Sequence, residues 1–139
     1  FPASNLWPAD PAARAHARTL AAEMHSGFLA LRTHMNMNIR RQRPGHGRTP
    51  EVDKDIARIT AMWRDCRTRF GAGGPFLFGA FTNADAMYAP VVTRFKTYGV
   101  SLDAECQAYA DAVLDLPAMR TWYADAEREP WTIAAFEGE

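Results

Sequence analysis

The sequence predicts an all-α protein built as a bundle of about five helices. Apolar residues recur at spacings of three and four along most of the chain, and several of these stretches open on residues that cap helices. No stretch alternates apolar and polar residues as a half-buried strand would. The 139 residues, of which 47% are hydrophobic, suffice for one core in one domain.

The first helix is expected to begin at Pro11 and to run to about residue 40. Asp10 can accept free backbone N–H groups at the helix start, where Pro11 has no N–H to lose. Five apolar residues then share one face: Leu20, Met24, Phe28, Leu31 and Met35. This pattern predicts one long amphipathic helix.

The second helix is predicted over residues 50–70. Before it, the polar segment 40–48 contains Pro44 and two glycines, which predicts a solvated loop. Thr49 followed by proline repeats the helix-start signal. A heptad-like series of apolar residues follows: Val52, Ile56, Ile59, Trp63, Cys66 and Phe70. We expect Gly71 to end this helix in the left-handed conformation.

The third helix is predicted to open on a capping box formed by Thr82 and Asp85. The preceding segment 75–79 is too apolar for a solvated loop and too short for a paired strand, so we expect it to lie across the core. Pro90 interrupts one backbone hydrogen bond of the helix, and Gly99 ends it. The apolar side is formed by Met87, Tyr88, Val91, Phe95 and Tyr98.

Two shorter helices complete the predicted bundle. The fourth is marked by Leu102, Tyr109, Val113 and Leu116, and Pro117 starts the fifth. The predicted organisation is a linker over residues 1–9, a helical domain over 10–130 and a tail over 131–139. The tail contains Trp131, Ile133 and Phe136, which predicts that it folds back onto the bundle.

The overall charge argues against broad electrostatic partners. Sixteen basic and sixteen acidic residues give a formal net charge of zero, so no global field attracts nucleic acid or an anionic membrane. No apolar run approaches the ~18 residues that a membrane span needs, and no signal peptide is evident. Cys66 and Cys106 match no redox or zinc motif, which predicts buried, unpaired thiols and a cytoplasmic location.

A self-contained catalytic set is not apparent. His25 and Ser26 are neighbours on a helix, where successive side chains diverge by roughly 100°, so they form no dyad. His16, His25 and His34 recur at nine-residue intervals and point alternately to opposite sides, which predicts no metal site. Glycine patterns that cradle phosphates are also missing.

Three motifs nevertheless stand together in a recognisable order. They are the apolar G-P-F-L-F-G segment over 74–79, the F-T-N-A-D cap over 81–85, and E-M-H-S-G-F over 23–28. Together they resemble the C-terminal helical domain of cytosolic glutathione transferases, especially bacterial beta-class members, which carry E-L-H-K-G-F. The resemblance covers roughly residues 6–130, and in it Thr82 and Asp85 serve folding rather than chemistry.

The resemblance implies an enzyme when the protein is intact. The reaction would transfer the thiolate of glutathione, a co-substrate, to a hydrophobic electrophile, without a metal, in a homodimeric detoxification enzyme. A preceding thioredoxin-like domain, lacking in this sequence, would hold glutathione and the catalytic residue. This chain is expected to be inactive alone and to supply the substrate-binding half.

The resemblance also implies roles for five residues here. His25 and Ser26 would line the glutathione cleft, although Ser26 replaces a lysine that could meet a glutathione carboxylate. Arg18 would reach a glutathione in the dimer, and Arg94 and Phe95 would contact the electrophile. The alternatives are a helix histidine satisfied by a carbonyl for His25 and ordinary core positions for Arg94 and Phe95.

A second hypothesis belongs to a different functional class. Helical domains of this type also occur as non-catalytic adaptors in translation factors and synthetase assemblies. A thioredoxin-like region upstream would favour the enzyme, and a different domain there, or none, would favour the adaptor. The motifs leave the co-substrate open, because the shape of an apolar pocket depends on side-chain packing. They also leave the reaction open between conjugation, isomerisation, dehalogenation and peroxide reduction.

Overall fold

A computed structural model describes residues 2–137, apart from the side chains of residues 2, 135 and 136. In chain order the elements are η1 (Pro2–Ser4), α1 (Pro11–Ser26), α2 (Leu29–His34), α3 (Pro50–Phe70), α4 (Asn83–Tyr98), α5 (Ala104–Leu114), α6 (Pro117–Arg128) and α7 (Ala134–Glu137). Within the described residues, β-structure is limited to two isolated bridges in segment 76–80. The predicted all-α fold is confirmed.

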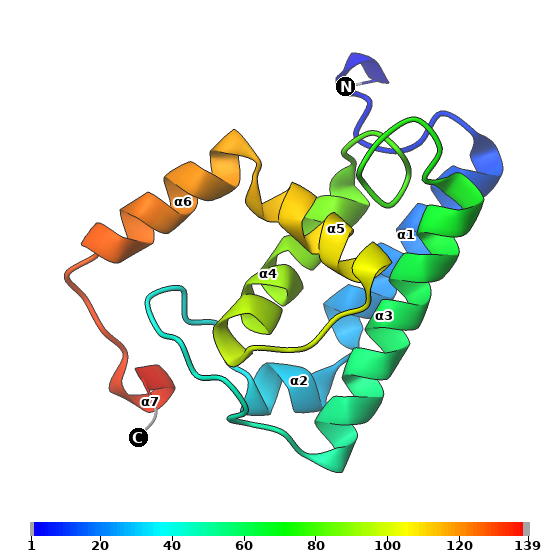
Figure 1. Cartoon of the computed structure of the whole chain (residues 1–139). Helices are drawn as coiled ribbons and strands as arrows, with labels where there is room; N and C mark the ends of the chain where they lie inside the picture. The colour runs from blue at the N-terminus through cyan, green and yellow to red at the C-terminus, as the bar shows by residue number, and fades with distance from the viewer. Residues whose placement is uncertain (1, 138–139) are drawn as a thin grey trace.

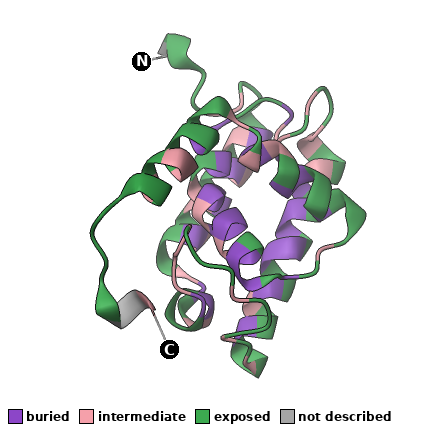
Figure 2. Cartoon of the chain, turned by 60° about the vertical axis from the view of Figure 1, so that its left-hand side comes forward, coloured by how far each residue is buried: buried purple, intermediate pink, exposed green. Residues whose placement is uncertain are grey.

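Helix α4 lies at the centre of the bundle (Figure 1). It packs against α1 and α5, and α5 in turn contacts both α3 and α6. The buried residues gather on the helices around α4, whereas α6 and the tail beyond it are mostly exposed (Figure 2). The core therefore lies between α1, α3, α4 and α5.

Aromatic rings from three helices meet in this core. The ring centre of Trp63 on α3 lies 5.9 Å from that of Tyr88 and 5.5 Å from that of Phe95, both on α4. It lies 4.8 Å from that of Tyr109 on α5. All four side chains are buried, and such inclined ring contacts add to the free energy gained from apolar burial. The cluster thus fastens α3, α4 and α5 together.

The start of α4 is the predicted capping box. The Thr82 N–H donates to Oδ2 of Asp85 at 2.8 Å, and the Thr82 hydroxyl donates to the same oxygen at 3.1 Å. The other oxygen of Asp85 accepts from the N–H of Leu77 at 3.1 Å. Burial raises the pKa of Asp85, although these hydrogen bonds favour its ionised form. Leu77 is fully buried, so segment 75–79 lies on the core as predicted.

The first predicted helix is two helices, so the prediction of one long helix to about residue 40 was wrong. Phe28 adopts the left-handed conformation, with φ 58° and ψ 42°, and redirects the chain between α1 and α2. A Cβ at Gly27 would lie 2.7 Å from the carbonyl oxygen of Glu23, so the break needs glycine there. Asp55 of α3 then accepts from the N–H of Leu31 at 2.9 Å and caps the new helix.

Most of the other predicted helix ends agree with the structure, but Leu102 and Leu116, predicted in the fourth helix, lie outside α5, and Gly71 differs in conformation. Asp10 and Thr49 cap α1 and α3, and Gly99 ends α4 with φ 63°. Gly71 was predicted to be left-handed, but it is right-handed, with φ −77° and ψ 0°. A Cβ there would lie 2.5 Å from the carbonyl oxygen of Arg67, so close approach rather than handedness favours glycine.

The tail returns to the bundle as predicted, but through polar contacts. Arg40 donates to the carbonyl oxygens of Glu129 at 2.7 Å and Trp131 at 3.0 Å. The expectation that buried apolar side chains would hold the tail was wrong, because Trp131 is 75% exposed and Ile133 is 63% exposed. The side chain of Phe136 lies outside the described residues.

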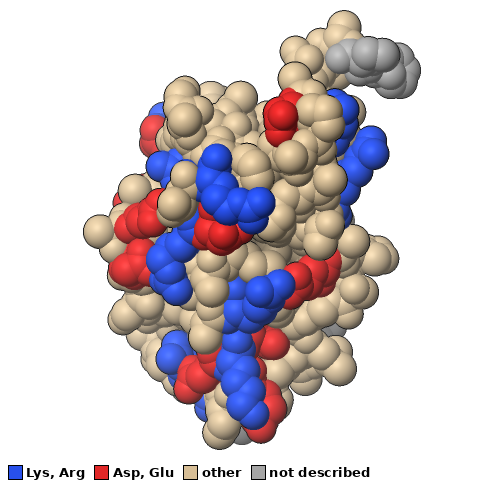
Figure 3. Space-filling view, turned by 90° about the vertical axis from the view of Figure 1, so that its right-hand side faces the viewer, with Lys and Arg blue, Asp and Glu red and all other residues tan. Residues whose placement is uncertain are grey.

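The face that carries α3 mixes acidic and basic side chains (Figure 3). Its ion pairs include Arg58 with Glu23 at 2.8 Å and Arg69 with Asp65 at 2.9 Å. Exposed pairs of this kind contribute about 0–1 kcal/mol each to the free energy of unfolding, so they add little to stability. In the described part of the chain, no helix combines the length and apolarity that a membrane crossing requires.

Replacing the buried capping carboxylate should destabilise the fold more than replacing an exposed one. Asp103 caps α5 from a more exposed position, so Asp103→Ala provides the matched control. We expect Asp103→Ala to lower the free energy of unfolding by about 0.5–2 kcal/mol. Asp85→Ala should lower it by about 3 kcal/mol or more, because two buried N–H groups lose their acceptor. Urea unfolding followed by circular dichroism measures both, and equal losses would contradict this reading.

Candidate functional site

A pocket of about 250 Å³ opens beside the break between α1 and α2. It is lined by Met24, His25, Arg32, Ala86, Met87, Pro90 and Arg94, and we call it the α1–α4 pocket. The pocket brings together His25 and Arg94, two candidate site residues that are far apart in the sequence. The packing of α1 against α4 produces this meeting.

His25 stands in the last turn of α1 with an exposed side chain. Its backbone carbonyl accepts from Nη1 of Arg32 at 3.0 Å. Its imidazole makes no hydrogen bond with the residues that the structure describes. The alternative interpretation of His25, a helix histidine bonded to a neighbouring carbonyl, therefore finds no such bond among the described residues.

Arg94 lies half-buried on α4 and holds the chain that follows α2. Its Nε donates to the carbonyl oxygen of Met35 at 2.9 Å, and its Nη1 donates to that of Pro90 at 3.2 Å. Burial lowers the pKa of Arg94, and the nearby charge of Arg32 lowers it further. No carboxylate of the described residues forms an ion pair with either arginine.

Arg32 is a pocket residue that sequence reasoning missed. In one unbroken helix it would lie two turns, or about 10 Å, beyond His25 along the axis. The break at Gly27 turns α2, and the Arg32 side chain reaches back to the end of α1. A signal existed in Gly27 itself, since glycine is unfavourable within a helix and often marks a boundary.

The other candidate residues lie outside the α1–α4 pocket. Ser26 is exposed, and its hydroxyl donates to the carbonyl oxygen of Ala22 at 3.0 Å. Arg18 is exposed two turns earlier on α1 than His25, with its guanidinium 5.7 Å from the ring centre of Trp7. Phe95 is only 2% exposed and belongs to the aromatic core. None of these three residues therefore lines the α1–α4 pocket with His25 and Arg94.

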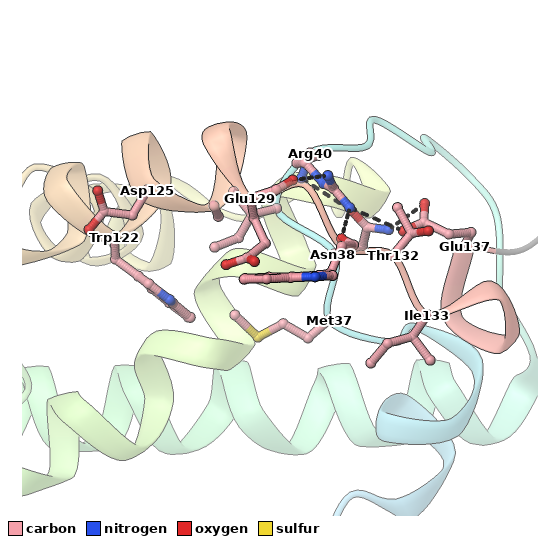
Figure 4. A pocket seen from close by; sticks show the side chains of 12 residues that line it. Met37, Asn38, Arg40, Trp122, Asp125, Glu129, Thr132, Ile133 and Glu137 are labelled. Carbon is pink, nitrogen blue, oxygen red and sulfur yellow. Dashed lines mark hydrogen bonds and ion pairs between the residues drawn. The ribbon is translucent and has the colours of Figure 1, made fainter.

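A second pocket, of about 330 Å³, lies between α6, the tail and residues 37–40 (Figure 4). Met37, Trp122 and Ile133 contribute apolar lining, and none of its residues was a candidate in the sequence. Arg40 is the basic residue of its lining, and the carboxylate of Glu137, 3.5 Å away, offsets its charge. It therefore lacks the uncompensated cations of the α1–α4 pocket.

Neither cysteine resembles a nucleophile. Cys66 and Cys106 are free and buried, as predicted. Burial raises the pKa of each thiol to about 12. Among the described residues, no cluster of three or more His, Cys, Asp or Glu side chains could hold a metal ion. Neither thiol lines the α1–α4 pocket.

Comparison with known proteins agrees with the helical architecture. The sequence model of the family described as "Glutathione S-transferase, C-terminal domain" matches residues 49–125, more than half of the chain. This range holds α3, α4 and α5 with the capping box of Thr82 and Asp85, and it includes Arg94. His25 and Arg32 precede it. No curated protein matches the chain.

Both thiols should be unreactive in the folded protein. With a pKa of about 12, their thiolate fraction at pH 8 is about a thousandfold below that of an ordinary cysteine. We expect Ellman's reagent to label the native chain at least about a hundredfold more slowly than the chain in urea. A native thiol that reacts as fast as in urea would contradict the buried positions of Cys66 and Cys106.

Proposed function

The chain belongs to the glutathione S-transferase C-terminal domain family, and on that premise we propose that it is the substrate-binding and dimerisation half of a glutathione transferase. In the intact protein a thioredoxin-like domain precedes it and supplies the catalytic residue and most of the glutathione site. The sulfur of glutathione then forms a bond to an electrophilic carbon of a hydrophobic compound. The electron pair displaced from that carbon leaves with a departing group or takes up a proton.

The main support for this proposal is that His25 and Arg94 both line the α1–α4 pocket. Met24, Met87 and Pro90 give the pocket apolar walls that suit a hydrophobic electrophile. The imidazole of His25 offers a hydrogen bond at the edge, where glutathione would approach from the preceding domain. This chain thereby orients the two reactants, while the thiolate is generated elsewhere.

The remaining candidate residues take supporting parts in the proposal. Ser26, exposed next to His25, lies at the side from which glutathione would enter. Arg18, exposed earlier on α1, would reach the glutathione bound in a homodimer. We assign the contact with the electrophile to Arg94, whereas the buried Phe95 positions α4 through its contact with Trp63.

The proposed setting is a homodimer in the cytoplasm that detoxifies electrophiles. Family membership supports the homodimer. The two free buried thiols support a reducing compartment.

One observation favours the non-catalytic adaptor as a second candidate. The family match covers residues 49–125 and leaves out His25 and Arg32. The matched range contains helices and a capping box that stabilise the fold, and an adaptor would need these features as well. The activity of the intact protein separates the two functions.

Replacing His25 should lower the activity of the intact protein. We expect His25→Ala to reduce kcat/KM for conjugation of glutathione to 1-chloro-2,4-dinitrobenzene by about 10- to 100-fold, because one hydrogen bond to a charged reactant is lost. His46→Ala, in an exposed loop, is the matched control and should leave kcat/KM unchanged. The 139 residues alone should give no turnover above the uncatalysed rate.

Two results would redirect the proposal. Turnover by the isolated chain would overturn the division of labour between the domains. An intact protein that neither conjugates glutathione nor binds to immobilised glutathione would favour the adaptor.

A further inference from the structure

We propose that the α1–α4 pocket binds the carboxylate of a small, largely apolar ligand through the guanidinium groups of Arg32 and Arg94. The inference deepens the proposed function and rests on it for the reaction that the bound ligand undergoes. The binding itself depends on residues of this chain alone.

The first argument is the charge of the pocket lining. Arg32 and Arg94 bring two guanidinium groups to one pocket, and no acidic residue lines it. Two carboxylates adjoin lining residues in the sequence, and both have other partners. Glu23 is bonded to Arg58 through both of its oxygens, at 2.8 and 2.9 Å, and Asp85 accepts from the N–H groups of Leu77 and Thr82. Arg32 is exposed, but its charge disfavours the charged form of the half-buried Arg94, and an anion bound between the two guanidinium groups offsets that repulsion.

The charge of most other arginines in the described part of the chain is offset by a carboxylate. They form ion pairs with carboxylates of the described residues: Arg40, Arg41, Arg48, Arg58, Arg64, Arg69, Arg120 and Arg128. Arg67 bonds to the carbonyl oxygens of Gly74 and Phe76, but it lines neither pocket described above. The α1–α4 pocket thus holds two arginines whose charge no described carboxylate offsets.

The second argument concerns donors that remain available. A guanidinium carries five N–H groups, and two of its nitrogens together can hold both oxygens of a carboxylate. Arg94 uses Nε and Nη1 for backbone carbonyls, so its Nη2 donates to none of the described residues. Arg32 uses Nη1 for the carbonyl of His25, which leaves its Nε and Nη2. These bonds fix both side chains while sparing N–H groups for a ligand.

The third argument is the size and character of the rest of the pocket. Apart from the cations and His25, its lining is apolar: Met24, Ala86, Met87 and Pro90. A volume of about 250 Å³ accommodates one aromatic ring with a short acidic arm. The carboxylate can come from glutathione or from an electrophilic co-substrate, and the two sources can be told apart by competition.

The test compares an acid with its neutral amide on the 139-residue chain. We expect 3-phenylpropanoate to bind at least about tenfold more tightly than 3-phenylpropanamide in calorimetric titration, because charge-assisted hydrogen bonds form only with the acid. Arg32→Gln and Arg94→Gln should each reduce this preference to less than about threefold. Arg120→Gln, on the exposed face of α6, is the matched control and should keep it.

Folding is checked separately for each variant by circular dichroism. Arg94→Gln also removes the hydrogen bond to Met35 and could unfold the chain. Arg32 is exposed on α2, so Arg32→Gln tests the proposal even if Arg94→Gln unfolds. Equal affinity for acid and amide in the unchanged chain would overturn the inference. A preference that survives in folded Arg32→Gln would overturn the assignment of the two guanidinium groups.

Competition by glutathione identifies the source of the carboxylate. Displacement of 3-phenylpropanoate by glutathione would support the site and assign it to a glutathione carboxylate. Retention of the acid in excess glutathione would support the site and assign it to the co-substrate. These measurements need no turnover. An inactive intact protein would therefore refute the proposed function, whereas the preference for the acid would still be tested by the titrations alone.

Discussion

The buried carboxylate of Asp85 is the interaction on which the rest of the structure depends. It satisfies N–H groups of Leu77 and Thr82 that would otherwise be buried without partners. The same residue therefore starts the central helix and fastens the apolar segment before it to the core. Since α4 contacts α1 and α5 and carries Arg94, this one carboxylate determines where the pocket lies.

The pocket itself arises from two departures from regular helix geometry. Left-handed Phe28 separates α1 from α2 and lets Arg32 reach back to His25, while Pro90 occupies the facing wall on α4. Neither the break nor the uncompensated arginines improves stability, because each removes regular hydrogen bonding or gathers like charge. Such concessions are typical of functional sites, where stability is given up for binding.

Local signals in the sequence account for much of the fold and less of the site. Thr49, Thr82 and Pro117 predict helix starts correctly because caps act over three or four residues. The start of α2 depends on Asp55, a partner from another helix, so no local pattern could reveal it. The motif resemblance singles out His25 and Arg94, but only the packing of α1 on α4 places them in one pocket with Arg32.

The polar attachment of the tail gives the two pockets different sensitivities to ionic strength. Arg41 and Glu137 form an exposed pair, and mobile ions screen such pairs strongly at physiological concentrations. The walls of the α1–α4 pocket are held by helix packing and by hydrogen bonds to carbonyls, which ions screen far less. Added electrolyte therefore weakens the attachment of Glu137 first, whereas the carbonyl bonds of Arg40 and the framework around Arg94 are affected far less.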